Sequence, residues 1–269
     1  MIKDKFEEYS KRFEGELRGG TFKFDFFDRL AVMWTLLTRI PLPKKFWPKI
    51  MPDRARTLTI APIVGGILGF LTGVVITFVN IMGIGQIGSV WIGAAFYAAV
   101  GWSLHLDGWG DLWDGIGSGR RGEELRSVMK DSRLGSFGAI SLILAFGLWT
   151  GLLLALGPHQ EALALMTAGA VGRFGSCTAA FYGKYPWESG MGKGAVDDFG
   201  GYELFLSAIS VLVFLPFAPM EWILSVLLVF TASYGAASQM NKRLGGVNGD
   251  VLGAAAVAGE LITLMVFAL

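Results

Sequence analysis

Three aspartates stand at helical spacing in one short stretch of the sequence. Asp107, Asp111 and Asp114 are at i, i+4 and i+7, so their carboxylates share one face if this stretch is helical. Carboxylates this close repel one another, which is costly near a membrane boundary unless a cation neutralises them. Oxygen ligands suit Mg²⁺, which completes its shell with water and substrate phosphates. The row therefore predicts a magnesium site; the alternative is a solvated cap on a helix end.

The residues that follow this row are those that phosphate chemistry needs. Arg126, Lys130 and Arg133 are candidate phosphate ligands, because arginine guanidinium groups bind phosphate oxygens in pairs and the lysine ammonium adds a positive charge. Gly135 would let the backbone approach a substrate where the next apolar segment begins, and helix amino termini favour anions. Asp131 is a candidate general base. A basic loop that only obeys membrane topology is the alternative.

A second acidic site precedes the last apolar segment. Asp250 is a candidate fourth metal ligand or general base, and Asn248 is a candidate substrate ligand. An Asn-Gly-Asp sequence is also an ordinary turn, and the sequence alone would be weak evidence for a site. Its predicted position on the same side of the membrane as the aspartate row strengthens its assignment to the active site. His105, which lies two residues before Asp107, is a further candidate catalytic residue.

Two other sets of residues have both a functional and a structural interpretation. Arg173 and Glu260 fall inside apolar segments, where an unpaired charge is costly. They either pair with each other or face a polar cavity, in which case Arg173 would bind substrate. The glycine-rich segment 183–201 is either a flap over the site, with Lys193 as a substrate ligand, or a plain linker.

The elements that must position these residues are membrane helices. Hydrophobic residues make up 53% of the 269 residues and charged residues only 17%, below the roughly 25% of soluble domains. We predict an all-α, polytopic integral membrane helical bundle with about seven transmembrane helices and an N-terminal interfacial helix over Phe22–Ile40. The predicted spans are 58–82, 88–106, 136–157, 162–182, 202–218, 222–241 and 251–269. Residues 1–21 form a charged extension, and 22–269 form one membrane-embedded domain.

Positive residues are distributed unevenly between the two sides of this arrangement. The connections around 83–87, 158–161 and 219–221 contain no Lys or Arg. By the positive-inside tendency, the amino terminus and the connections 107–135, 183–201 and 242–250 face the cytoplasm, and the carboxyl terminus lies outside. We therefore predict a multi-pass protein of the cytoplasmic (inner) membrane with its active site facing the cytoplasm. A net charge of +1 gives no indication of a nucleic-acid partner, and homo-oligomerisation is left open.

Four motifs resemble those of the cobalamin synthase family, the adenosylcobinamide-GDP ribazoletransferases or cobalamin-5′-phosphate synthases. They are Thr38-Arg39-Ile40-Pro41-Leu42-Pro43, His105-Leu106-Asp107-Gly108 continuing through Asp111 and Asp114, Lys130-Asp131-Ser132-Arg133-Leu134-Gly135, and Gly245-Gly246 through Gly249-Asp250. The resemblance runs from about Phe27 to the carboxyl terminus. It implies a transferase that joins adenosylcobinamide-GDP to α-ribazole, or to its 5′-phosphate, and releases GMP.

The residues and the resemblance lead to one mechanistic hypothesis. Mg²⁺ bound by the aspartate row bridges the pyrophosphate, while Asp131 or Asp250 activates the ribazole 3′-hydroxyl. Arg126, Lys130 and Arg133 neutralise charge on the departing GMP. The first rival is a phosphatidyltransferase-like enzyme that uses a nucleotide-activated alcohol, although no Ala-Arg pair follows Asp111. The second rival is a cation-coupled transporter, which predicts internal repeats and polar residues near the membrane midplane.

Overall fold

All regular structure in the described part of the chain is helical. The structure, a computed structural model, describes residues 25–48, 51–156, 160–190 and 192–269, so the predicted charged extension 1–21 lies outside the described residues. The α-helices are α2 (Phe26–Leu37), α3 (Arg54–Leu58), α4 (Ala61–Val79), α5 (Gln86–Tyr97), α6 (Ser103–Gly117), α7 (Gly122–Met129), α8 (Ser136–Ala155), α9 (Glu161–Tyr182), α10 (Lys193–Asp197), α11 (Gly201–Leu212), α12 (Pro219–Arg243) and α13 (Gly249–Ala268). Short 3-10 turns at Lys44–Phe46 and Leu215–Phe217, and π-helical turns at Asn80–Ile84 and Ala98–Trp102, lie between them.

Helices occupy all seven positions at which membrane spans were predicted. Five helical stretches are long and apolar enough to cross a membrane: Arg54–Ile84, Gln86–Gly117, Ser136–Ala155, Pro219–Arg243 and Gly249–Ala268. The remaining two differ in character. α9 has 22 residues but many small and polar side chains, and α11 has only 12 residues. The predicted all-helical, multi-spanning fold is confirmed.

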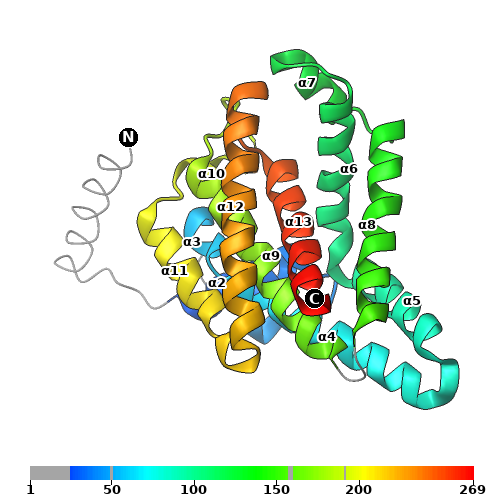
Figure 1. The fold of residues 1–269 in the computed structure, drawn as a ribbon. Helices are drawn as coiled ribbons and strands as arrows, with labels where there is room; N and C mark the ends of the chain where they lie inside the picture. The colour runs from blue at the N-terminus through cyan, green and yellow to red at the C-terminus, as the bar shows by residue number, and fades with distance from the viewer. Residues whose placement is uncertain (1–24, 49–50, 157–159, 191) are drawn as a thin grey trace.

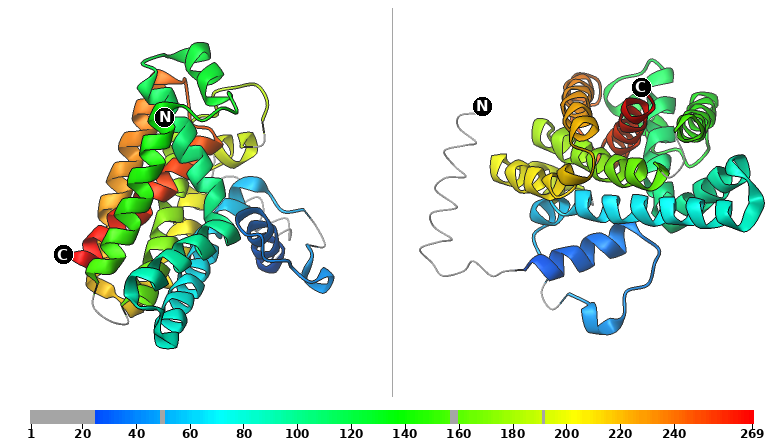
Figure 2. Two further views of the ribbon diagram at one scale, coloured as in Figure 1. Left: turned by 90° about the vertical axis from the view of Figure 1, so that its right-hand side faces the viewer. Right: turned by 60° about the horizontal axis from the view of Figure 1, so that its bottom comes forward.

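Small residues let α9 lie at the centre of the molecule. A Cβ on Gly65 of α4 would lie 2.2 Å from the carbonyl oxygen of Gly169 of α9, and a Cβ on Gly169 would lie 2.2 Å from the carbonyl oxygen of Gly65. A Cβ on Gly69 would meet the backbone of Leu165. The glycine spacing of α4 thus permits close packing of the two helix backbones. Figure 2 (right) shows α2 outside α4, and α12 and α13 on the far side of α9.

The predicted surface helix corresponds to α2, which ends at Leu37, three residues short of the predicted end at Ile40. Its last helical residue is Leu37, three residues after Trp34, whose indole N–H donates to the carbonyl oxygen of Ile40 at 3.0 Å. The helix buries Ala31, Met33 and Leu37 and leaves Phe27 exposed. Residues 22–24 of the predicted helix lie outside the described residues.

The three connections predicted to share one side of the membrane do lie at one end of the molecule. Figure 1 shows α7 above the upper end of α6, and the connection between α12 and α13 also at the upper end. The backbone N–H of Val247 donates to the carbonyl oxygen of Lys184 at 2.6 Å, and the Arg126 guanidinium lies 4.5 Å from the centre of the Trp187 ring. These contacts join all three connections, so the residues they carry can form one site.

Candidate active site

Two glycines let α6 and α13 cross closely at their acidic ends. A Cβ on Gly108 would lie 2.8 Å from the Cα of Asp250, and a Cβ on Gly253 would lie 3.3 Å from the Cα of His105. Carbon atoms in ordinary contact are about 3.5–4.0 Å apart, so the crossing at Gly108 requires the absence of a side chain. Because Asp107 directly precedes Gly108, this crossing brings Asp107 and Asp250 into one site.

Asp107, Asp111 and Asp250 form what we call the carboxylate cluster. The charges of Asp250 and Asp107 repel a charged Asp111 most strongly, and Asp107 also repels Asp250. No Lys, Arg or His of the described chain forms an ion pair with these three carboxylates. Nor do any three His, Cys, Asp or Glu side chains in the described ranges converge closely enough to hold a metal ion. The cluster therefore carries uncompensated negative charge and would complete a metal shell only with water and substrate oxygens.

Asp114, the last aspartate of the row, binds the amino terminus of α8. Its Oδ2 accepts the backbone N–H of Gly135 and its Oδ1 accepts that of Gly138, each at 2.7 Å. A Cβ on either glycine would lie 2.3 Å from an Asp114 carboxylate oxygen, so both glycines are needed for this contact. The anion at this helix amino terminus is thus a side chain of the protein, and the Gly135 amide is engaged by Asp114.

The two glycines before α13 have different tasks in bringing that helix to the site. Gly245 has φ of 83°, a left-handed conformation that favours glycine. A Cβ on Gly246 would lie 2.1 Å from the carbonyl oxygen of Lys184, where the two connections touch. Gly245 therefore turns the chain out of α12, and Gly246 permits the close approach of the segment that follows α9.

Asn248 fixes the first turn of α13 and the position of Asp250. Its Oδ1 accepts the backbone N–H of Val251 at 3.1 Å, and its Nδ2 donates to Oδ2 of Asp250 at 2.7 Å. Asn248 is buried. Both ends of its amide are thus committed to the protein, and its contact with a substrate would have to run through Asp250.

Trp187 connects α7 to the segment that follows α9. The Arg126 guanidinium lies 4.5 Å and the Lys130 Nζ 5.4 Å from the centre of its ring, which is attractive because the ring face is negative. The Tyr185 ring packs edge-on against Trp187 at 5.6 Å. Burial, followed by the negative charge of Asp250, raises the pKa of the Tyr185 phenol. Tyr185 therefore stays a hydrogen-bond donor near Asp250 at neutral pH.

Of three other predicted site residues, Asp131 and Arg133 are exposed and Lys193 is partly buried. Arg133 Nη2 donates to Oδ2 of Asp131 at 2.6 Å, and this hydrogen bonding lowers the pKa of Asp131 to about 2. A carboxylate with so low a pKa is a weak base. Lys193 Nζ lies 3.5 Å from both the carbonyl oxygen of Trp187 and Oδ2 of Asp197. None of the three is among the residues brought together at the crossing of α6 and α13.

His105 and Arg173 lie inside the bundle. His105 is 5% exposed, and its Nδ1 has no hydrogen-bond partner among the described residues. Arg173 is fully buried and ion-paired with Glu260, and its Nη1 donates to the hydroxyl of Tyr97 at 2.9 Å. The Tyr97 hydroxyl donates in turn to Oε1 of Glu260 at 2.8 Å. Of the two alternatives for Arg173, the structure therefore shows the ion pair, and the side chain is not accessible to a substrate.

Comparison with known proteins identifies the family of this chain. The family model described as cobalamin-5-phosphate synthase matches residues 29–268. The chain belongs to the cobalamin-5-phosphate synthase family. Relatives named adenosylcobinamide-GDP ribazoletransferase, from Brucella canis and Brucella suis, are 32% identical over 245 residues, which cover 85% of this chain and 92% of each relative. The Brucella ovis relative is 31% identical over the same shares. No solved structure matches the chain.

Membership of the cobalamin-5-phosphate synthase family confirms the resemblance and the transferase activity predicted from the motifs. The transporter and the phosphatidyltransferase-like enzyme are therefore no longer the favoured functions. The structure also explains why three positions of these motifs are glycines. Gly108 permits the helix crossing, Gly135 receives Asp114, and Gly246 lets two connections touch.

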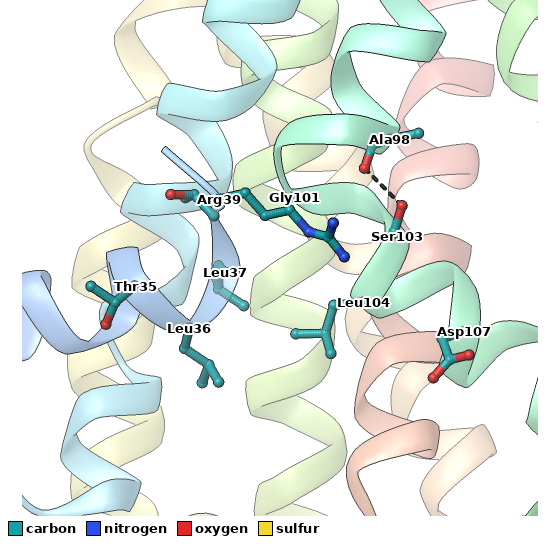
Figure 3. Close-up of a pocket in the computed structure, with 10 residues that line it drawn as sticks. Thr35, Leu36, Leu37, Arg39, Ala98, Gly101, Ser103, Leu104 and Asp107 are labelled. Carbon is teal, nitrogen blue, oxygen red and sulfur yellow. Dashed lines mark hydrogen bonds between the residues drawn. The ribbon is translucent and has the colours of Figure 1, made fainter. Parts of the chain in front are cut away.

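One residue of the cobalamin-5-phosphate synthase motifs was not assigned a role from the sequence. Arg39 lines a cleft of about 490 Å³ whose opposite wall includes Asp107 (Figure 3). The sequence signal was its position in the first motif, Thr38 to Pro43. Arg39 lies 64 residues before Ser103, which also lines the cleft, so sequence spacing alone could not bring the two together.

Proposed function

We propose that the crossing of α6 and α13 is the active site at which this protein transfers the adenosylcobinamide-phosphate group from adenosylcobinamide-GDP to α-ribazole or its 5′-phosphate, with release of GMP. The observation that carries the proposal is the uncompensated carboxylate cluster, formed by residues of two different motifs. The substrates follow from the names of the family and of its relatives.

The donor set of the carboxylate cluster fits Mg²⁺. Its ligands are oxygens only, no cation among the residues that the structure describes pairs with them, and they are too few and too far apart to replace a full hydration shell. Asp107, Asp111 and Asp250 would bind the ion partly through its water ligands, because no three acidic side chains of the described residues converge closely enough to hold it directly. Asp114 would act indirectly because its oxygens already accept two amides. When bound, Mg²⁺ supplies charge neutralisation for the pyrophosphate oxygens.

Side chains of the protein accept the proton of the nucleophile and stabilise the leaving group. The 3′-hydroxyl oxygen of the ribazole attacks the phosphorus attached to the cobinamide, and the bond from that phosphorus to the GMP oxygen breaks. Asp250 accepts the hydroxyl proton, since it belongs to the cluster, whereas the Asp131 carboxylate is paired with Arg133 and has a pKa of about 2. Arg126 and Lys130 stabilise the negative charge on GMP.

The test is Asp107→Asn in purified protein reconstituted in lipid, with adenosylcobinamide-GDP, α-ribazole and Mg²⁺, monitored by release of GMP. We expect turnover to fall by at least ~10²-fold, as when a charged transition-state ligand is lost, without loss of the folded state. Glu221→Gln, at the opposite end of α12, is the matched control and should retain turnover. Full activity of Asp107→Asn would remove the assignment.

We also propose that the carboxylate cluster faces the cytoplasm. The connection that carries α7 contains five Lys and Arg residues and the segment that follows α9 contains two, whereas the connections at the other end contain none. Single cysteines in a Cys177→Ser background test this, since Cys177 is buried. A membrane-impermeant maleimide should label Glu124→Cys only in inside-out vesicles and Met220→Cys only in right-side-out vesicles. The reverse pattern would invert the topology.

A further inference from the structure

The cleft that contains Arg39 is formed by two segments far apart in the sequence. The end of α2 and the turn after it form one wall, with Thr35, Thr38 and Arg39; the π-helical turn Ala98–Trp102 and the start of α6 form the other, with Ser103 and Asp107. Figure 3 shows the Arg39 side chain extending past Gly101 toward Ser103, with Asp107 further along α6. A volume of about 490 Å³ is in the range of small-molecule sites.

The backbone around Arg39 is held by several hydrogen bonds that do not involve its side chain. The N–H of Arg39 donates to the carbonyl oxygen of Val100 at 2.7 Å, and the N–H of Ile40 donates to Oγ1 of Thr38 at 3.2 Å. A Cβ on Gly101 would lie 2.3 Å from the carbonyl oxygen of Leu37, so the π-helical turn and the end of α2 touch through their backbones. π-Helical turns are frequent at functional sites.

The guanidinium of Arg39 is left uncommitted by this arrangement. The hydroxyls of Thr35 and Ser103 donate to the backbone carbonyls of Val32 and Ala98 at 2.9 Å and 2.7 Å. Arg39, which is exposed, forms no ion pair or side-chain hydrogen bond with any residue in the described ranges, although Asp107 lines the same cleft. The cleft therefore presents one cation with free donors on a backbone that is held in place.

We infer that Arg39 binds the phosphomonoester of the acceptor and makes the enzyme selective for the phosphorylated ribazole; this rests on the proposed function. In-line transfer places the attacking and the leaving group on opposite sides of the phosphorus. Cations lie toward both ends of the aspartate row of α6: Arg39 lines the same cleft as Asp107, and the α7 cations follow Asp114. Since the α7 end serves the departing GMP, the Arg39 end serves the acceptor.

A phosphomonoester suits this position for two reasons. Its charge is close to −2 at neutral pH, and its oxygens accept two parallel N–H bonds from a guanidinium. The family description names a 5-phosphate product, so an acceptor that already carries this phosphate gives the product directly. An unphosphorylated ribazole would fill the same cleft without making this contact.

The test compares two acceptors, α-ribazole and α-ribazole 5′-phosphate, with the wild type, Arg39→Ala and Arg39→Lys in lipid. For Arg39→Ala we expect KM for the phosphorylated acceptor to rise roughly 10- to 100-fold, the equivalent of one charge-assisted bidentate contact. KM for the unphosphorylated acceptor and for adenosylcobinamide-GDP should change little. Arg39→Lys should fall between, because it keeps the charge but loses the paired donors. Arg120→Ala removes an exposed arginine outside the cleft and should retain the wild-type selectivity.

The outcomes separate this inference from the function on which it rests. Equal losses with both acceptors, a rise confined to KM for adenosylcobinamide-GDP, or unchanged selectivity would each overturn the role of Arg39. If the wild type releases GMP with neither acceptor, the proposed function fails and this inference fails with it. Arg39→Ala should fold, because the backbone hydrogen bonds of the turn remain. If Arg39→Ala does not fold, the KM values of Arg39→Lys for the two acceptors provide the test.

Discussion

Replacing Gly108 by Ala tests whether the helix crossing assembles the site. The added Cβ would lie 2.8 Å from the Cα and 2.9 Å from the carbonyl oxygen of Asp250. Ordinary carbon contacts are about 3.5–4.0 Å, so α6 and α13 must separate locally by roughly 1 Å. Both contacted atoms are backbone, so rotation of a side chain cannot relieve the clash. The separation moves Asp107 away from Asp250.

The expected effects follow from this displacement. Misplacing reacting groups by about 1 Å costs roughly 10²-fold in rate, and overpacking costs about 1–3 kcal/mol of stability. Alanine in a helix is by itself more stable than glycine by roughly 0.8–1 kcal/mol. A measured destabilisation of Gly108→Ala must therefore come from packing and not from helix propensity.

The assay is GMP release together with thermal unfolding of the protein in the same lipid or detergent. Gly147→Ala on α8 is the matched control, because its Cβ would meet no atom within 4 Å, and we expect full activity. Gly253→Ala should be intermediate, since its Cβ would lie 3.3 Å from the Cα of His105 and needs a smaller shift. If Gly108→Ala is as active and as stable as Gly147→Ala, the crossing does not assemble the site.

Three further substitutions separate stability from activity. Asp114→Ala should lower the free energy of unfolding by about 3 kcal/mol or more, because two charge-assisted hydrogen bonds to α8 are lost; an unchanged thermal midpoint would contradict this. Arg173→Met should cost about 3–5 kcal/mol by leaving Glu260 buried without its partner, and Arg173→Met with Glu260→Met should recover most of that loss in thermal unfolding. Asp131→Asn should leave GMP release and its pH dependence near neutrality unchanged, because the Asp131 pKa of about 2 makes it a poor base; loss of turnover would restore Asp131 as the base.

The acid sensitivity of the Asp131 pair has a defined sign. Arg133 lowers the pKa of Asp131 in the folded protein, so the pair favours the folded state above the ordinary Asp pKa. That contribution is lost as the pH falls through about 2. Near neutrality the pair is therefore constant and cannot produce a pH dependence of turnover.

The helical face of Asp107, Asp111 and Asp114 could be predicted because it depends on a local period of 3.6 residues. α6 continues to Gly117, so the row lies on one helix as expected. The association of this row with Asp250 could be predicted only through the sidedness of the connections. What decides it in the structure is the absence of a side chain at Gly108, which the spacing of glycines does not distinguish from general packing.

The roles of Arg173 and Gly135 could not be fixed from the sequence because they depend on distant partners. Arg173 pairs with a residue 87 positions away, and the sequence left the ion pair and the polar cavity equally open. Gly135 was predicted to bring the backbone close to a substrate, and its amide is bound to an anionic side chain of the protein itself. That the anion is Asp114, 21 residues earlier, depends on how α6 and α8 pack.

The aspartate row of α6 is therefore not a single functional unit. Asp107 lines the cleft of Arg39, and Asp111 is repelled by the charges of the neighbouring aspartates. Asp114 is bound to the amino terminus of α8. One residue type at one helical spacing thus has different tasks because each turn of the helix meets a different neighbour. Loss of a carboxylate at the first position should reduce turnover with little loss of stability, and loss at the last should reduce stability first. The same rule explains why a fourth carboxylate from α13 is needed: the row alone leaves only two side chains free to bind a cation.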